Sequence, residues 1–213
     1  MYYSRKVLSF YVQIGRRSDL LGKIREKYES AMRPVGRTLA AMGFTPNMIT
    51  TASLAISMSA GLAYAMGLPL VGAIGLIGSG VVDMFDGAVA RATGKTTKFG
   101  AVYDHVLDRY AEFFVLIGIG LGGLVNWFWV IFCLFGMIMA SFTRAKAESV
   151  GGLKSCTVGI AERQEKIILL LIGSVFDPII PQALSACVII VGILSHITVM
   201  QRLHYTFKNA EVT

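Results

Sequence analysis

The chain has 213 residues, of which 54% are hydrophobic and only 15% are charged, and its mean hydropathy is +0.63. Soluble domains carry charge on about a quarter of their residues, so this composition excludes an ordinary soluble protein and indicates an integral membrane protein. The net charge of +7 is interpreted as the basic charge of cytoplasmic loops, and no nucleic-acid partner is expected.

The first 45 residues form a basic segment ahead of the first apolar stretch. From Leu20 to Met42, apolar residues recur at intervals of three and four, with lysines and arginines between them. This periodicity is typical of an amphipathic helix that lies in the membrane interface. We therefore divide the chain into residues 1–45, a cytoplasmic segment with a juxtamembrane amphipathic helix, and residues 46–213, a membrane domain. No signal peptide is predicted, because no small-residue cleavage site follows the first apolar run.

Six apolar stretches follow, and each predicts a membrane-spanning helix. Thr45 suits the N-cap of the first helix, and Pro46 suits its first turn. The predicted spans cover residues 46–66, 69–92, 98–121, about 126–148, 158–175, and a last stretch that follows residue 181 and ends near residue 204. The fold class is therefore an all-α integral membrane protein with six transmembrane helices and an N-terminal interfacial helix.

The distribution of positive charge predicts how the spans are oriented. With the N-terminus in the cytoplasm, all 20 lysines and arginines fall on cytoplasmic segments or at the cytoplasmic ends of helices. The outer turns near residues 67, 123 and 178 carry none. The positive-inside rule then predicts that both termini and the charged ends of the helices face the cytoplasm. Charged residues that are far apart in the sequence would then lie at the same depth in the membrane, which requires a polar cavity open to the cytoplasm.

An acidic stretch covers the end of the second span and the beginning of the third. Asp83 and Asp86 share a helical face at a spacing of three residues. Asp104 and Asp108 share a face at a spacing of four. If these faces oppose each other, the carboxylates repel unless cations lie between them. Mg²⁺ or Mn²⁺ suits such oxygen ligands, and two ions are expected. The alternative is a structural salt-bridge cluster, for example between Asp86 and Arg91.

These acids belong to a longer motif. The pattern is Asp83-x-x-Asp86-Gly87-x-x-Ala90-Arg91, then eight residues, then Gly100-x-x-x-Asp104-x-x-x-Asp108. In identity and spacing it resembles the signature of the CDP-alcohol phosphotransferases, and the six-span layout with an interfacial helix is similar to that family as well. The resemblance implies that a CDP-linked lipid, diacyl or archaetidyl, gives its phosphatidyl-type group to an alcohol and that CMP is released.

The resemblance also implies roles for single residues. The metal ligands would be Asp83, Asp86, Asp104 and Asp108. Asp108 would also be the catalytic base that takes the proton of the acceptor hydroxyl. The CDP-lipid site would be formed by Asp83, Asp86, Gly87, Ala90, Arg91, Thr97 and Gly100. Homodimers are usual in the family, so a homodimer is expected.

A basic cluster lies at the ends of the fourth, fifth and sixth spans. Its members are Arg144, Lys146, Arg163, Lys166 and Arg202. Cations at this density favour an acceptor that carries its own phosphate, and the alternative is positive charge at the level of the lipid headgroups. The segments 144–148 and 162–166 resemble those of phosphatidylinositol-phosphate and archaetidylinositol-phosphate synthases. This resemblance implies that inositol 1-phosphate is the acceptor.

Three other functions are weighed against this hypothesis. The same reaction could use glycerol 3-phosphate, another inositol phosphate or serine as acceptor. An aspartate-rich membrane prenyltransferase would also use Mg²⁺ and a lipid diphosphate, but it would release pyrophosphate instead of CMP. A divalent-cation transporter would move metal without any nucleotide.

Overall fold

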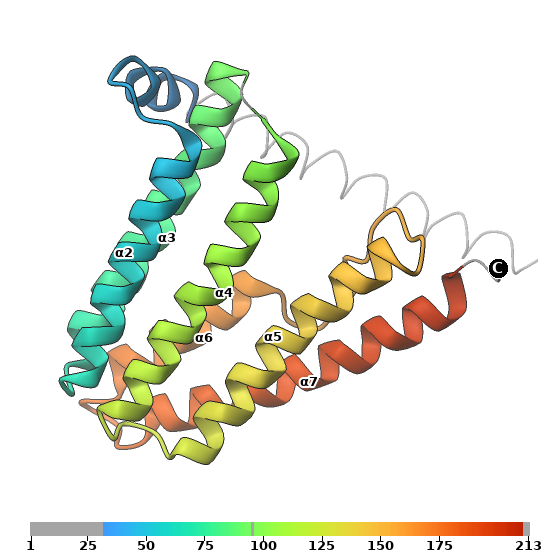
Figure 1. Cartoon of the computed structure of the whole chain (residues 1–213). Helices are drawn as coiled ribbons and strands as arrows, with labels where there is room; N and C mark the ends of the chain where they lie inside the picture. Colours follow the sequence, from blue (N-terminus) through green and yellow to red (C-terminus); the bar gives the residue numbers. More distant parts are fainter. Residues whose placement is uncertain (1–31, 95, 211–213) are drawn as a thin grey trace, which may run out of the picture.

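The computed structural model describes residues 32–94 and 96–210, which form helices and connecting segments without a strand among them. Residues 32–41 are helical, and longer helices follow in the order shown in Figure 1. They are α2 (Pro46–Ala65), α3 (Pro69–Thr93), α4 (Lys98–Leu121), α5 (Trp127–Ser149), α6 (Arg163–Phe176) and α7 (Ala183–Asn209). The prediction of an all-α fold is confirmed. The part of the predicted amphipathic helix that precedes residue 32 lies outside the described residues.

Local sequence signals account for most helix boundaries. The Thr45 side chain accepts a hydrogen bond from the Met48 N–H at 3.3 Å, and Pro46 occupies the first turn of α2, as predicted. The helix that was predicted over residues 158–175 begins only at Arg163. Its start is fixed by a capping interaction in which Glu165 accepts a hydrogen bond from the Glu162 N–H at 2.9 Å.

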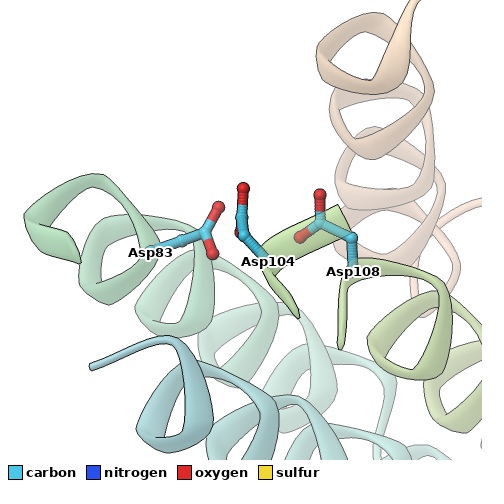
Figure 2. Close-up of side chains that lie close together, drawn as sticks. All are labelled: Asp83, Asp104 and Asp108. Atoms are coloured by element: carbon cyan, nitrogen blue, oxygen red, sulfur yellow. The ribbon is translucent and has the colours of Figure 1, made fainter. Parts of the chain in front are cut away.

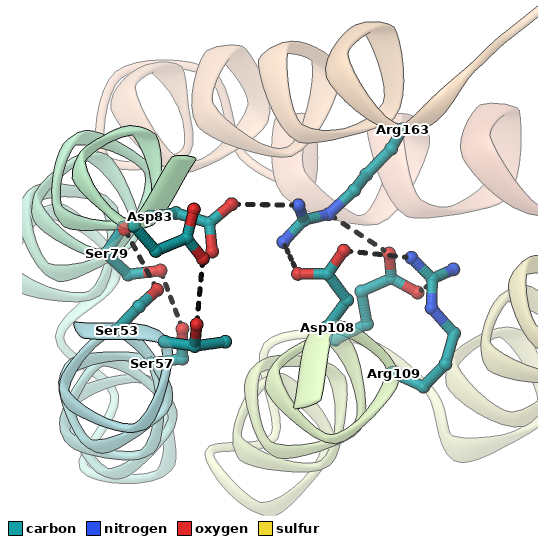
Figure 3. A network of polar contacts seen from close by, with 10 residues as sticks. Ser53, Ser57, Ser79, Asp83, Asp108, Arg109 and Arg163 are labelled. Atoms are coloured by element: carbon teal, nitrogen blue, oxygen red, sulfur yellow. Dashed lines mark hydrogen bonds and ion pairs between the residues drawn. The ribbon is translucent and has the colours of Figure 1, made fainter. Parts of the chain in front are cut away.

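Helices α2, α3 and α4 pack as one group, in which α2 contacts both of the others. A side chain at Gly118 of α4 would collide with the Gly61 backbone of α2, so these two helices approach closely because both positions are glycine. On the other side, the Ser53 hydroxyl donates to the Ser79 carbonyl at 3.0 Å (Figure 3). The group therefore holds α3 and α4, which carry the acidic stretch, on either side of α2.

A second group contains α5 and α7, which run side by side, and α6 packs against α7 and also contacts α3 (Figure 1). The two groups meet in an apolar core near the end of α2. Tyr64, Leu116, Val130 and Leu184 are fully buried there, and the Tyr64 hydroxyl lies 2.7 Å from Ser174 Oγ of α6. Away from this core α4 and α5 diverge (Figure 1).

Residues 150–162 connect α5 to α6 without regular structure. Side chains from the neighbouring helices hold this connection through its main chain. These bonds join Glu148 to the Cys156 N–H at 2.9 Å, Gln201 to the Ile160 N–H at 2.8 Å, and Arg202 to the Val158 carbonyl at 2.9 Å. The connection is therefore fixed against the ends of α5 and α7, beside the residues of the predicted basic cluster.

By length and composition, α2, α3, α5 and α7 are able to cross a membrane. This agrees with an integral membrane protein. Helix α4 is not apolar enough by the same criterion of composition, because charged side chains recur along it from Asp104 to Glu112. Helix α6 does not meet it because it has only 14 residues.

Candidate active site between two cavities

Three carboxylates from two helices converge. Asp83 of α3 and Asp104 and Asp108 of α4 each offer an oxygen, and these atoms lie within 4.8 Å of one another (Figure 2). Asp108 is buried and the other two are half-buried. The packing of α3 and α4 against α2 brings these two helical faces together. We refer to Asp83, Asp104 and Asp108 as the carboxylate cluster.

Asp86, the fourth predicted ligand, does not belong to this cluster. The buried Thr50 hydroxyl of α2 donates a hydrogen bond to Asp86 Oδ2 at 2.8 Å. The salt bridge to Arg91 that was considered as an alternative is absent among the described residues, and Arg91 is exposed with its guanidinium near Gly87. Asp86 therefore lies beside the cluster, oriented by α2.

A first cavity of about 350 Å³ lies between α2, α3 and the start of α4. Five of the seven residues predicted for the CDP-lipid line it, namely Asp86, Gly87, Ala90, Thr97 and Gly100. Asp83 and Arg91 are not among its lining residues. Three of the five carry a methyl group or no side chain, so a ligand can approach the backbone closely. Thr97 also caps α4, because its hydroxyl accepts from the Gly100 N–H at 2.9 Å.

A second cavity of about 610 Å³ lies between α4, α5, α6 and Arg202 of α7. Four of the five predicted basic residues line it, namely Arg144, Arg163, Lys166 and Arg202. The fifth, Lys146, is exposed, and its Nζ lies 5.6 Å from the centroid of the Phe142 ring instead. The acids Asp108 and Glu112 also line this cavity.

Arg163 joins the carboxylate cluster to the second cavity. Its Nη1 lies 3.1 Å from Asp83 Oδ2, and its Nη2 lies 2.6 Å from Asp108 Oδ1 (Figure 3). The start of α6 at this residue and the contact between α6 and α3 place the guanidinium there. The sequence predicted Arg163 as an acceptor ligand only, whereas the structure also gives it three acidic partners, Asp83, Asp108 and, at 3.8 Å, Glu112.

Arg202 has a second role in holding the fold. Its Nη1 donates to the Ala140 carbonyl of α5 at 2.6 Å, in addition to the bond from Nε to the Val158 carbonyl. Arg144 forms an ion pair with Glu148 at 3.1 Å, and Lys166 is buried. Parts of the basic cluster therefore hold α5, α7 and the connection between α5 and α6 in place.

The carboxylate cluster stands between the two cavities. Asp104 lines the first cavity and Asp108 lines the second, one helical turn further along α4. The cluster offers only carboxylate oxygens, which are the ligands that hard divalent cations such as Mg²⁺ and Mn²⁺ prefer. Two ligands, one bound in each cavity, would therefore meet at a set of oxygens that suits a divalent metal.

Sequence reasoning missed two residues at this site. Glu112 continues the four-residue spacing of Gly100, Asp104 and Asp108, so the extension of that pattern by one turn could have found it. Thr50 had no such signal, because 36 residues separate it from Asp86 and only the packing of α2 against α3 brings the two together.

Comparison with known proteins gives the same assignment as the sequence motif. The CDP-alcohol phosphatidyltransferase family model matches residues 44–200, which include every residue that lines the two cavities except Arg202. The chain is 38% identical to the archaetidylinositol phosphate synthase of Pyrococcus horikoshii over 91% of this chain and the whole of that protein. It is 31% identical to the phosphatidylinositol phosphate synthase of Mycobacteroides abscessus, over 84% of this chain and 85% of that protein.

Solved structures of a relative have the same fold. The crystal structure of Mycobacterium tuberculosis phosphatidylinositol phosphate synthase with CDP-DAG bound has a TM-score of 0.78 and 30% sequence identity, and covers 85% of this chain and 97% of that chain. The same synthase in complex with manganese and citrate has a TM-score of 0.79 over 85% of this chain and 92% of that chain. The match over residues 44–200 and the relatives of nearly full length lead to one conclusion: the chain belongs to the CDP-alcohol phosphatidyltransferase family.

Proposed function

We propose that this protein transfers the phosphatidyl-type group of a CDP-lipid to inositol 1-phosphate and releases CMP. The observation that carries the proposal is the position of the carboxylate cluster between two cavities of different character. The first cavity is lined by small and acidic residues of the family motif, and the second is lined by five lysines and arginines, namely Arg109 and the four predicted basic residues, together with acids. Archaetidylinositol and phosphatidylinositol phosphate synthases among the relatives support the choice of substrates.

The CDP part of the donor would occupy the first cavity. Gly87, Ala90 and Gly100 leave room for it against the backbones of α3 and α4. Thr97 would border the same ligand. Asp83 and Arg91, the remaining predicted residues, would contact the donor from the edge of the cavity, because neither lines it. A relative crystallised with CDP-DAG supports a CDP-lipid as the donor.

A divalent metal would be held by Asp83, Asp104 and Asp108, with Asp86 as a further ligand, and it would neutralise the diphosphate of the donor. The convergence of the carboxylate cluster within 4.8 Å supports this assignment. A relative crystallised with manganese supports it as well. Two ions, either Mg²⁺ or Mn²⁺, form part of the proposal.

The acceptor would bind in the second cavity with its phosphate on the basic residues. Lys166 is the best placed, because the other three predicted cations already have partners: Arg163 is paired with two acids, Arg202 donates to two carbonyls and Arg144 is paired with Glu148. We assign Lys146 no contact with the acceptor in this arrangement, since it lies outside the cavity. Cations on one side of the reacting centre orient a phosphate-bearing alcohol toward the carboxylate cluster.

Asp108 would act as the base. It is buried, lines the acceptor cavity and belongs to the carboxylate cluster. In the reaction the acceptor hydroxyl oxygen bonds to the phosphorus that carries the lipid, and the bond from that phosphorus to the CMP oxygen breaks. The hydroxyl proton goes to Asp108, and CMP leaves with the electron pair of the broken bond.

The test is CMP release by the purified protein with a CDP-lipid, Mg²⁺ or Mn²⁺, and one acceptor at a time. We expect CMP with inositol 1-phosphate and little with serine, which lacks a phosphate. Efficient turnover with glycerol 3-phosphate and none with inositol 1-phosphate would keep the reaction class but reject the acceptor. Pyrophosphate in place of CMP would reject the reaction class itself.

We also propose six transmembrane helices, with the site and both termini on the cytoplasmic side. Residues 1–45 would form a cytoplasmic segment with an interfacial helix ahead of the membrane domain, and two chains would form a homodimer. The concentration of lysines and arginines at one end of the helices supports the orientation.

Two exposed positions offer a matched test of this orientation. Val150 follows α5 and is 77% exposed, and Ile179 follows α6 and is 75% exposed. An impermeant thiol reagent added outside intact cells should label Ile179→Cys and leave Val150→Cys unlabelled. The reverse pattern would invert the topology.

A further inference from the structure

Glu112 is a buried acid that the proposed reaction does not use. It lies on α4, four residues beyond Asp108, and only 8% of its surface is exposed. It lines the second cavity. Neither of its carboxylate oxygens accepts a hydrogen bond from the residues that the structure describes. Buried carboxylates rarely lack hydrogen bonds, because an unpaired acceptor loses the hydrogen bonds that water would have given it.

The cations around Glu112 supply charge but leave its oxygens available. Arg109 Nη1 lies 2.9 Å from Glu112 Oε2, within the same helix, in a geometry that does not make a hydrogen bond. Arg163 Nε lies 3.8 Å from Oε1, which is too far for one. Since a carboxylate has about four acceptor positions, at least one per oxygen remains for a ligand in the cavity.

The position of Glu112 relative to the other groups indicates what that ligand offers. Asp108, one turn away on the same face of α4, is the proposed base for the reacting hydroxyl. Lys166, from α6, lines the same cavity and suits a phosphate. An acceptor whose reacting hydroxyl is at Asp108 and whose phosphate is among the cations would bring its remaining atoms close to Glu112. A carboxylate there accepts hydrogen bonds from hydroxyl groups and repels a second phosphate.

We infer that Glu112 binds the non-reacting hydroxyl groups of a polyol monophosphate in the second cavity, and so selects acceptors rich in hydroxyls. This inference rests on the proposed function and assigns a specificity residue to it. It predicts that hydroxyls beyond the reacting one contribute to acceptor binding. It also predicts that acceptors with two phosphates bind poorly.

The first experiment compares kinetics of wild type, Glu112→Gln and Glu112→Ala with inositol 1-phosphate and a CDP-lipid. We expect Glu112→Ala to raise the KM for inositol 1-phosphate by about 10- to 100-fold, the usual effect of losing hydrogen bonds to a charged group. The KM for CDP-lipid should change by less than about twofold, because Glu112 is not in the first cavity. Glu112→Gln, which keeps the volume and one acceptor, should raise the KM less.

The second experiment varies the acceptor. Single-deoxy inositol 1-phosphates are tested on wild type, and at least one should show a KM raised by about 10-fold, because a site built for a hydroxyl rejects the analogue without it. On Glu112→Ala that same analogue should behave like inositol 1-phosphate, since the interaction is already lost.

Two results would overturn the role of Glu112. One is a wild-type KM that no deoxy analogue changes. The other is a Glu112→Ala variant that loses kcat and raises the KM of both substrates equally, which would make Glu112 a counter-ion that only holds Arg109 and Arg163. Failure of the proposed function is distinct, because wild type would then release no CMP with inositol 1-phosphate at all.

Discussion

The two halves of the site differ in how the chain brings their residues together. The acidic half, Asp83, Asp86, Asp104 and Asp108, comes from two consecutive helices, and short spacings set which side chains share a face. The basic half, Arg144, Arg163, Lys166 and Arg202, comes from three helices that pack together only in the folded protein. Two of the basic side chains, Arg144 and Arg202, also hold neighbouring segments of the chain, whereas the acidic side chains have partners at the site itself, Arg163 and Thr50. Substitutions in the acidic half should therefore report on chemistry, and those in the basic half on chemistry and structure together.

Removal of divalent metal should have the largest effect, because it disables the whole acidic half at once. Dialysis against a chelator should lower CMP release to the background, a loss of roughly 10³-fold or more, since metal stabilises the charge of phosphoryl transfer by several kcal/mol. Added Mg²⁺ or Mn²⁺ should restore it. Full activity without metal would contradict the role of the carboxylate cluster.

Asp108→Asn should be the most damaging single substitution. Loss of the base should lower kcat by roughly 10²- to 10⁴-fold, while CDP-lipid still binds in the first cavity. Asp177→Asn is a matched control, because Asp177 accepts a hydrogen bond from the Leu184 N–H at 3.0 Å and asparagine can replace that acceptor. The measurement is single-turnover CMP release together with equilibrium CDP-lipid binding. Near-normal kcat in Asp108→Asn would remove it as the base.

Arg163→Lys tests the residue that connects the two halves. Lysine keeps the charge but cannot reach Asp83 and Asp108 with two nitrogens at once. We expect a loss of about 10- to 100-fold in kcat/KM for the acceptor, with a change in the metal concentration needed for half activity. A change in acceptor KM alone, with the metal dependence intact, would confine Arg163 to the basic half. Thermal unfolding of the detergent-solubilised variant checks that it is folded.

Lys146→Ala should have the smallest effect. It tests whether the acceptor needs cations that line the second cavity or only a high number of cations nearby. Lys146 is exposed and outside the second cavity, so its loss should change kcat/KM for the acceptor by less than about twofold. Lys166→Ala, the matched change inside the cavity, should cost at least about 10-fold. Equal losses in the two variants would mean that Lys146 reaches the acceptor in solution.

Much of the fold and of the acidic half could be predicted from the sequence, for a physical reason. Helix boundaries follow from caps and apolar length, so the predicted starts at Pro46, Pro69 and Lys98 match the structure. Residues four apart on a helix share a face whatever surrounds them, so the convergence of Asp104 and Asp108 needed no tertiary information.

The rest depended on tertiary packing. Whether Lys146 or Lys166 faces a cavity depends on how α5 and α6 are rotated against their neighbours, which no spacing reveals. The fifth helix was predicted too long, because bonds from α5 and α7 hold residues 156–160 in the connection ahead of α6. Thr50 meets Asp86 only because α2 and α3 pack together.

The main-chain bonds of the segment 150–162 make it a good place for a spectroscopic label. Gln201 binds the N–H of Ile160, and the Ile160 side chain itself is 57% exposed. Ile160→Cys would keep that bond, since every residue except proline has an N–H. Of the natural cysteines, Cys133 and Cys156 are buried, so Cys187→Ser would leave position 160 as the main reactive thiol of the described residues. Because the adjacent Ala161 lines the second cavity, a fluorophore at position 160 should report acceptor binding without depending on turnover.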